Sequence, residues 1–94
     1  MKLLVTGNIT KGFASWVQMQ DGLAPEMEKV GIKLIWAGTN PDESEVFAVI
    51  EMEDPAQMKT FGEREDVAKI RAEAGVDVAS TRVISPIAED YLPD

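Results

Sequence analysis

The hydrophobic pattern in the middle of the chain predicts two neighbouring strands that are apolar on both faces. In the first run, strict alternation places Ile32, Leu34 and Trp36 on one face, and an isoleucine and an alanine lie on the other. In the second run the even-numbered residues from 46 to 52 are all apolar, and Phe47 and Val49 lie opposite them. A strand with one solvated face would alternate between apolar and polar residues. We therefore expect both faces of this part of the sheet to be covered.

The N-terminal third of the chain predicts a strand followed by two short helical pieces. The strand covers residues 2–9 and the first helix follows it, with Thr10 as a suitable N-cap. Gly22 and Pro25 interrupt the helical spacing, so we expect the first piece to end there and a second piece to follow. The face predicted to point inward on the first helix contains Phe13, Trp16, Val17 and Gln20.

Local signals mark the boundaries of the next elements. Asn40 and Pro41 suit the first and second positions of a type I turn between the two central strands. Asp54, the proline after it and Gln57 predict a helix start with a capping box. The apolar residues of that helix change phase around Gly62, which predicts a bend or a break there.

The C-terminal quarter predicts one more strand and a tail. Gly75 ends the helical region, and residues 76–84 form the fourth predicted strand. Residues 85–94 carry Tyr91 and Leu92 among acidic residues and form either a frayed end or an arm laid over another surface. A chain of 94 residues is expected to form a single domain, here covering residues 1–94.

The order of these elements, βαββαβ, predicts an α+β fold of the ferredoxin-like kind. In that arrangement a four-stranded antiparallel sheet carries both helical segments on one face. The opposite face would expose an apolar patch larger than the few hundred Å² that are usual on a monomer. A second copy of the chain, related by a two-fold axis, would cover it. We therefore expect a homodimer formed through the open sheet face.

Composition narrows the classes of function. Seventeen acidic and nine basic residues give a formal net charge of -8, which disfavours nucleic acid and anionic membranes as partners. The chain has no cysteine and no histidine, so zinc, copper and haem would lack their usual ligands, and we expect no metal and no cofactor. The N-terminal apolar run is too short for a signal peptide, and no segment reaches the ~18 apolar residues of a membrane span. We expect a cytoplasmic protein.

Three segments carry a resemblance to a known superfamily. The element order and the patterns GIKLIWAG, EVFAVIEMEDPAQMKTF and AGVDVASTRVISPI resemble those of the dimeric α+β barrel superfamily, in particular its small uncharacterised single-domain members, over residues 2–84. The resemblance implies ferredoxin-like protomers that pack sheet against sheet around a central barrel. The superfamily includes cofactor-independent monooxygenases, isomerases, haem-containing members and stress-related proteins, so its fold alone does not select an activity. Members that depend on a histidine are not matched, because this chain has none.

Four residues on predicted strands are candidate ligand-binding residues. Trp36 either stacks on a flat ligand or fills the core or a dimer interface, and the same alternatives apply to Phe47. Arg82 anchors a carboxylate or enolate, protects an edge strand, or forms a surface ion pair. Some monooxygenases of the superfamily use an Asn, a Trp and an Arg, and Asn8 completes such a set here. No local motif aligns these residues with that trio, so no catalytic role is transferred.

The remaining polar groups have simpler interpretations. Arg64 and Arg71 lie on predicted helix and are expected to be solvated or paired. Asp42, Glu43 and Glu45 form an acidic cluster, but the spacing and the missing glycine do not match a Ca²⁺ loop, so we interpret it as a solvated turn. No serine has a histidine to activate it. We therefore assign no catalytic residue.

Three functional hypotheses follow. The first is a homodimer that binds a small apolar or aromatic molecule, in a cavity between the sheet and the helices or inside the barrel. The second is a cofactor-independent enzyme of the monooxygenase or isomerase kind, in which a group such as Arg82 stabilises an oxyanion. The third is an interaction module without a ligand.

Overall fold

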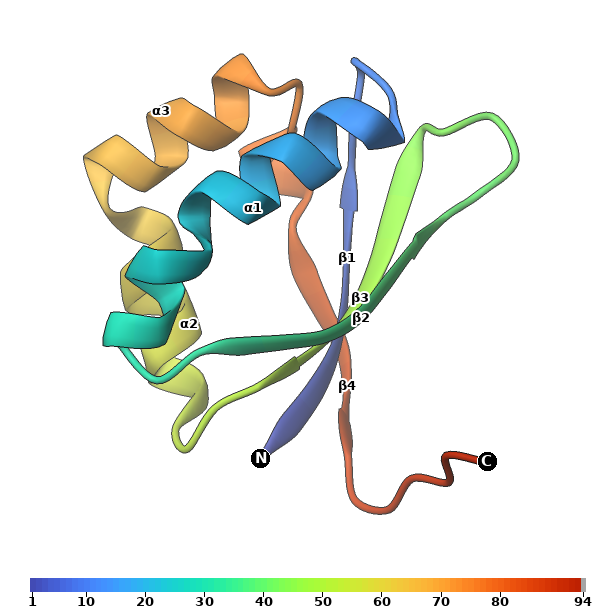
Figure 1. Cartoon of the computed structure of the whole chain (residues 1–94), viewed down its shortest axis with the longest axis vertical. Helices are drawn as coiled ribbons and strands as arrows, with labels where there is room; N and C mark the ends of the chain where they lie inside the picture. Colours follow the sequence, from blue (N-terminus) through green and yellow to red (C-terminus); the bar gives the residue numbers. More distant parts are fainter. Residues whose placement is uncertain (94) are drawn as a thin grey trace.

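The computed structural model describes residues 1–93 and consists of one antiparallel sheet with three helices on one of its faces (Figure 1). The last residue of the predicted tail, Asp94, lies outside the described residues. The elements in chain order are β1 (Lys2–Asn8), α1 (Phe13–Lys29), β2 (Lys33–Thr39), β3 (Glu45–Glu51), α2 (Pro55–Glu63), α3 (Glu65–Glu73), the 3-10 helix η1 (Val78–Ser80) and β4 (Arg82–Ile87).

The sheet has the strand order β2-β3-β1-β4, and every neighbouring pair is antiparallel. The α+β class and the four-stranded antiparallel sheet are therefore confirmed. The arrangement is compatible with a ferredoxin-like fold, but it matches the predicted βαββαβ order only in part, because the second helical region consists of α2, α3 and η1. None of the helices within residues 1–93 is long and apolar enough to cross a membrane.

Helix α1 is continuous, so the prediction of two short pieces was wrong. It runs through Gly22 and includes Pro25, although proline removes one backbone hydrogen bond from a helix interior. The helix buries Met19, Leu23 and Met27, which lie four residues apart and form one stripe against the sheet. Burial of this stripe stabilises the helix across both unfavourable residues.

The start of α1 also differs from the prediction. Gly12, with φ 86°, occupies the N-cap position instead of Thr10, and it provides no side-chain cap. The cap comes from the turn between β2 and β3, where Oε1 of Glu43 accepts a hydrogen bond from the backbone N–H of Phe13 at 2.8 Å. The expected inward position of Val17 was wrong, because that side chain is exposed. The buried stripe lies on the neighbouring part of the helix surface.

Helices α2 and α3 follow the predicted start and the predicted break. Asp54 accepts a hydrogen bond from the backbone of α2, and the side chain of Gln57 bonds back to the Asp54 N–H, so the capping box is confirmed. The break falls at Arg64, whose ψ of 133° is not helical. The guanidinium of Arg64 lies over the ring of Phe61 at 5.4 Å from its centroid, which links the two helices across the break.

The C-terminal strand begins later than predicted. Val76 forms only an isolated bridge with Ile9, η1 follows, and β4 starts at Arg82 and continues to Ile87. The tail therefore begins after residue 87 instead of at residue 85. Its Asp90 forms an ion pair with Lys2 of β1 at 2.9 Å, and Figure 1 shows the tail leaving the sheet on the side away from the helices.

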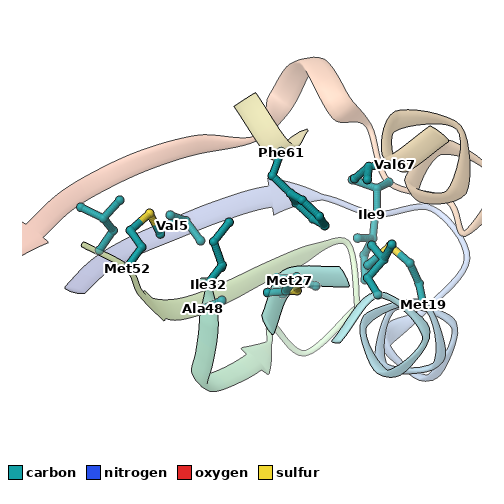
Figure 2. Packing of buried hydrophobic residues seen from close by; sticks show 13 residues of the cluster. Val5, Ile9, Met19, Met27, Ile32, Ala48, Met52, Phe61 and Val67 are labelled. Atoms are coloured by element: carbon teal, nitrogen blue, oxygen red, sulfur yellow. The ribbon is translucent and has the colours of Figure 1, made fainter. Parts of the chain in front are cut away.

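The hydrophobic core lies between the helices and one face of the sheet. Figure 2 shows these side chains, with Phe61 pointing from α2 into the cluster. The strands β1 and β3 contribute every second residue to this core. Leu3 of β1 and Val67 of α3 are among the most completely buried residues. The buried core consists of Leu3, Val5, Ile9, Met19, Leu23, Met27, Ile32, Val46, Ala48, Met52, Phe61, Val67 and Val76.

A bulge in β2 reverses the predicted direction of Trp36. Leu34 pairs with Ile50, but Trp36 pairs with Val49, so Ile35 is an extra residue on this strand. Trp36 therefore does not share a face with Leu34, as strict alternation predicted. It lies with Val49 on the face away from the helices, where it is 56% exposed. We call this face the open face; its apolar residues include Leu4, Trp36, Phe47, Val49 and Ile87.

Candidate functional site

A cavity of about 510 Å³ lies between the helices and the sheet. Its wall is mainly aliphatic and aromatic, with residues from all three helices and from all four strands. Trp16 contributes from α1 and stacks on Phe13, with ring centroids 5.7 Å apart and planes inclined by 8°. Met58 and Phe61 contribute from α2, and Val67 from α3. The sequence led us to expect an apolar cavity either between the sheet and the helices or inside a barrel, and this cavity has the first of these positions.

The charged residues of the wall differ in their exposure. Lys59 and Glu63 on α2 and Arg82 on β4 are exposed and lie at the rim. Arg71 on α3 is half-buried. It is the one charged residue of the cavity wall, within the described part of the chain, that is withdrawn from solvent.

Arg71 has few polar partners. Its Nη2 donates a hydrogen bond to Oγ1 of Thr81 at 2.5 Å, and its Nη1 faces Gly62, where an added Cβ would lie 3.6 Å away. Burial lowers the pKa of the Arg71 guanidinium. The ion pairs within residues 1–93 use Lys2, Lys29 and Arg64 as cations. The expectation that Arg64 and Arg71 are solvated or paired is confirmed for Arg64, whereas Arg71 is half-buried and forms no ion pair within residues 1–93.

A glycine in β1 makes room for the Thr81 side chain. A Cβ on Gly7 would lie 3.2 Å from Oγ1 of Thr81, which is tighter than ordinary van der Waals contact. A larger residue at position 7 would displace the hydroxyl that accepts the hydrogen bond from Arg71. Glycine weakens a strand interior and often marks the close approach of another group. Gly7 therefore helps to position Arg71 through Thr81.

The four candidate residues from the sequence lie along the open face and not around one point. Asn8 and Arg82 are exposed, Trp36 is 56% exposed, and Phe47 is half-buried. Trp36 lies on β2 and Arg82 on β4, which are the two outer strands of the sheet, roughly 14 Å apart at the usual spacing of strands. Phe47 and Arg82 both pair with Thr6 and so lie on either side of it, whereas Trp36 and Arg82 lie on opposite outer strands. The enzyme hypothesis stays a prediction.

The acidic turn has structural partners for each carboxylate. Ser44 donates a hydrogen bond to Asp42 at 2.6 Å, which lowers the pKa of the Asp42 carboxyl. Glu43 caps α1, and Glu45 accepts a hydrogen bond from the buried hydroxyl of Thr6 at 2.7 Å. Within residues 1–93 no group of three or more acidic side chains could hold a metal ion.

Sequence reasoning did not select Arg71, although a signal for it exists. Val67 is 1% exposed, and Arg71 follows it by four residues, so both lie on the same face of α3. Val67 belongs to the apolar set that follows the change of phase near Gly62, and the helical period would have placed Arg71 beside it.

No protein family matches the sequence, and no curated protein is significantly similar to it.

Proposed function

We propose that this protein binds one small apolar or aromatic molecule in the cavity between its helices and its sheet. The observation that supports the proposal is the cavity itself, which has a volume of about 510 Å³ and a mainly apolar wall. Ligand pockets in proteins typically have volumes of about 300 to 1,000 Å³ and a few polar groups that orient the ligand. A compact ligand with one or two rings fits this range.

The proposed functional unit is a homodimer formed through the open face. Trp36 is 56% exposed there, and an exposed aromatic residue on an apolar sheet face is typical of an interface. Both ends of the open face contain acidic and basic residues. Glu51 pairs with Lys2 and with Lys33 at one end, and Glu45 bonds to Thr6, which pairs with Arg82, at the other. The support for the interface is therefore its apolar centre, and a two-fold axis would place this centre of one copy over that of the other.

The binding proposal can be tested with the neutral fluorescent probe N-phenyl-1-naphthylamine. We expect saturable binding of one probe molecule per chain. Met58→Trp should weaken binding, because Met58 lines the cavity and a larger side chain would fill it. Val17→Trp is the matched control, since Val17 is an exposed helical residue that does not line the cavity. Thermal unfolding monitored by circular dichroism verifies that both variants are folded.

Two outcomes would contradict the proposal. Wild-type protein that does not bind the probe saturably has no functional apolar cavity of this size. Equal weakening by Met58→Trp and Val17→Trp would place the probe on the surface and not in the cavity.

A further inference from the structure

The guanidinium of Arg71 is a partly desolvated cation for which residues 1–93 provide no anionic partner. A guanidinium carries five N–H groups, and within residues 1–93 one hydrogen bond is found for this side chain, to the neutral hydroxyl of Thr81. Burial of a charge without a counter-charge is unfavourable. Arg64 on the same helical region shows the usual alternative, because its Nη2 lies 2.7 Å from Oδ2 of Asp66.

The two groups placed against the guanidinium of Arg71 are both uncharged. Thr81 accepts a hydrogen bond from Nη2, and Nη1 lies near Gly62, where an added Cβ would be in ordinary van der Waals contact at 3.6 Å. Neither residue neutralises the charge. The guanidinium also borders the apolar cavity, so a ligand that fills the cavity would lie against it.

The charge balance of the cavity wall is opposite to that of the whole protein. The wall contains the basic residues Lys59 and Arg71 and one acidic residue, Glu63; Arg82 borders it only at the edge of the sheet, because its register places its side chain on the open face. The chain as a whole has seventeen acidic and nine basic residues. A local excess of positive charge in an acidic protein favours an anionic ligand, and the net charge of -8 favours a monoanion over a dianion such as a phosphate monoester.

We propose that the ligand of this cavity is a monocarboxylate with an apolar or aromatic body, and that its carboxylate binds the guanidinium of Arg71. Two parallel N–H···O bonds are the usual geometry of an arginine with a carboxylate. The apolar wall then holds the body of the ligand. This inference rests on the proposed function, because it assigns the chemical class of the ligand for the same cavity.

The test compares 2-naphthoate with 2-naphthalenemethanol, which have the same ring system and differ in the charged group. Each compound competes with the neutral probe N-phenyl-1-naphthylamine. We expect wild-type protein to bind the carboxylate about tenfold more tightly or better, as a charge-assisted hydrogen bond in a partly buried site provides. This preference should disappear in Arg71→Met and persist in Arg64→Met. The control removes the same charge from a residue that already has a carboxylate partner.

A measurement on wild-type protein keeps the test decisive if Arg71→Met does not fold. The affinity for 2-naphthoate should fall as salt is raised from low to high concentration, and the affinity for the alcohol should not fall. Equal affinity for the two compounds, or a preference that survives in Arg71→Met, would overturn the inference and leave the proposed function intact. If neither compound nor the neutral probe binds, the proposed function itself fails.

Discussion

The indole of Trp36 lies over Gly38, two residues further along β2. A Cβ on Gly38 would lie 2.7 Å from Cη2 of the ring and 2.9 Å from Cζ2, closer than real side chains approach. Glycine at this position therefore lets the ring lie along the open face. A large aromatic surface laid along a sheet in this way is a suitable contact for a second sheet.

The first prediction concerns the dimer. We expect wild-type protein to sediment as a dimer and Trp36→Glu as a monomer, because the substitution replaces an exposed aromatic side chain of the proposed interface with a charge. Val17→Glu changes the charge equally at an exposed position of α1 on the helical side, and it should remain dimeric. Analytical ultracentrifugation distinguishes these states. Monomeric wild-type protein would contradict the homodimer and leave the open face for a different protein.

The second prediction concerns two glycines that should respond in opposite ways to the same substitution. Gly22 lies in the middle of α1 with nothing within 4 Å of an added Cβ. Gly22→Ala should raise the free energy of unfolding by about 0.5–1 kcal/mol, because alanine is the better helix former. Gly75 has φ 92°, and its Cβ would lie 2.9 Å from the backbone nitrogen of Lys11.

Gly75→Ala should therefore lower the free energy of unfolding by about 1 kcal/mol or more, since it adds both backbone strain and a close contact. Urea unfolding of the two variants beside wild type measures both effects. Stabilisation by Gly75→Ala would show that the left-handed turn after α3 is not required for the fold.

The third prediction concerns two carboxyl groups near the surface. A hydrogen bond from Arg64 lowers the pKa of Asp66, and a hydrogen bond from Ser44 lowers the pKa of Asp42. Both should titrate below the ordinary aspartate value of about 3.9. A lowered pKa in the folded state stabilises the fold above the unfolded value, and this contribution is lost as the pH falls below about 4.

Carboxyl ¹³C NMR titration measures the pKa of each aspartate and so tests the hydrogen bond from Arg64 and the hydrogen bond from Ser44 separately. Arg64→Met should raise the pKa of Asp66 and leave that of Asp42 unchanged, and Ser44→Ala should have the reverse effect. Each variant thus serves as the control for the other. An unchanged pKa of Asp66 in Arg64→Met would mean that the pair seen in the structure does not persist in solution.

The amino-acid sequence by itself determined the features that depend on a few neighbouring residues. The capping box at Asp54 and the turn at Asn40 are both present, because each is made by residues within three or four positions. The break between the two C-terminal helices was predicted from the change of hydrophobic phase and lies two residues from Gly62, at Arg64.

Only the tertiary structure decided where several of the important side chains lie. Strict alternation cannot predict the bulge at Ile35, which depends on how β2 pairs with β3 and which moves Trp36 to the open face. The continuity of α1 through Pro25 depends on the packing of its buried stripe against the sheet. The environment of Arg71 in α3 depends on Thr81, which is ten residues away in the chain, and on Gly7 in β1. These contacts join distant parts of the chain, and a local pattern carries no information about them.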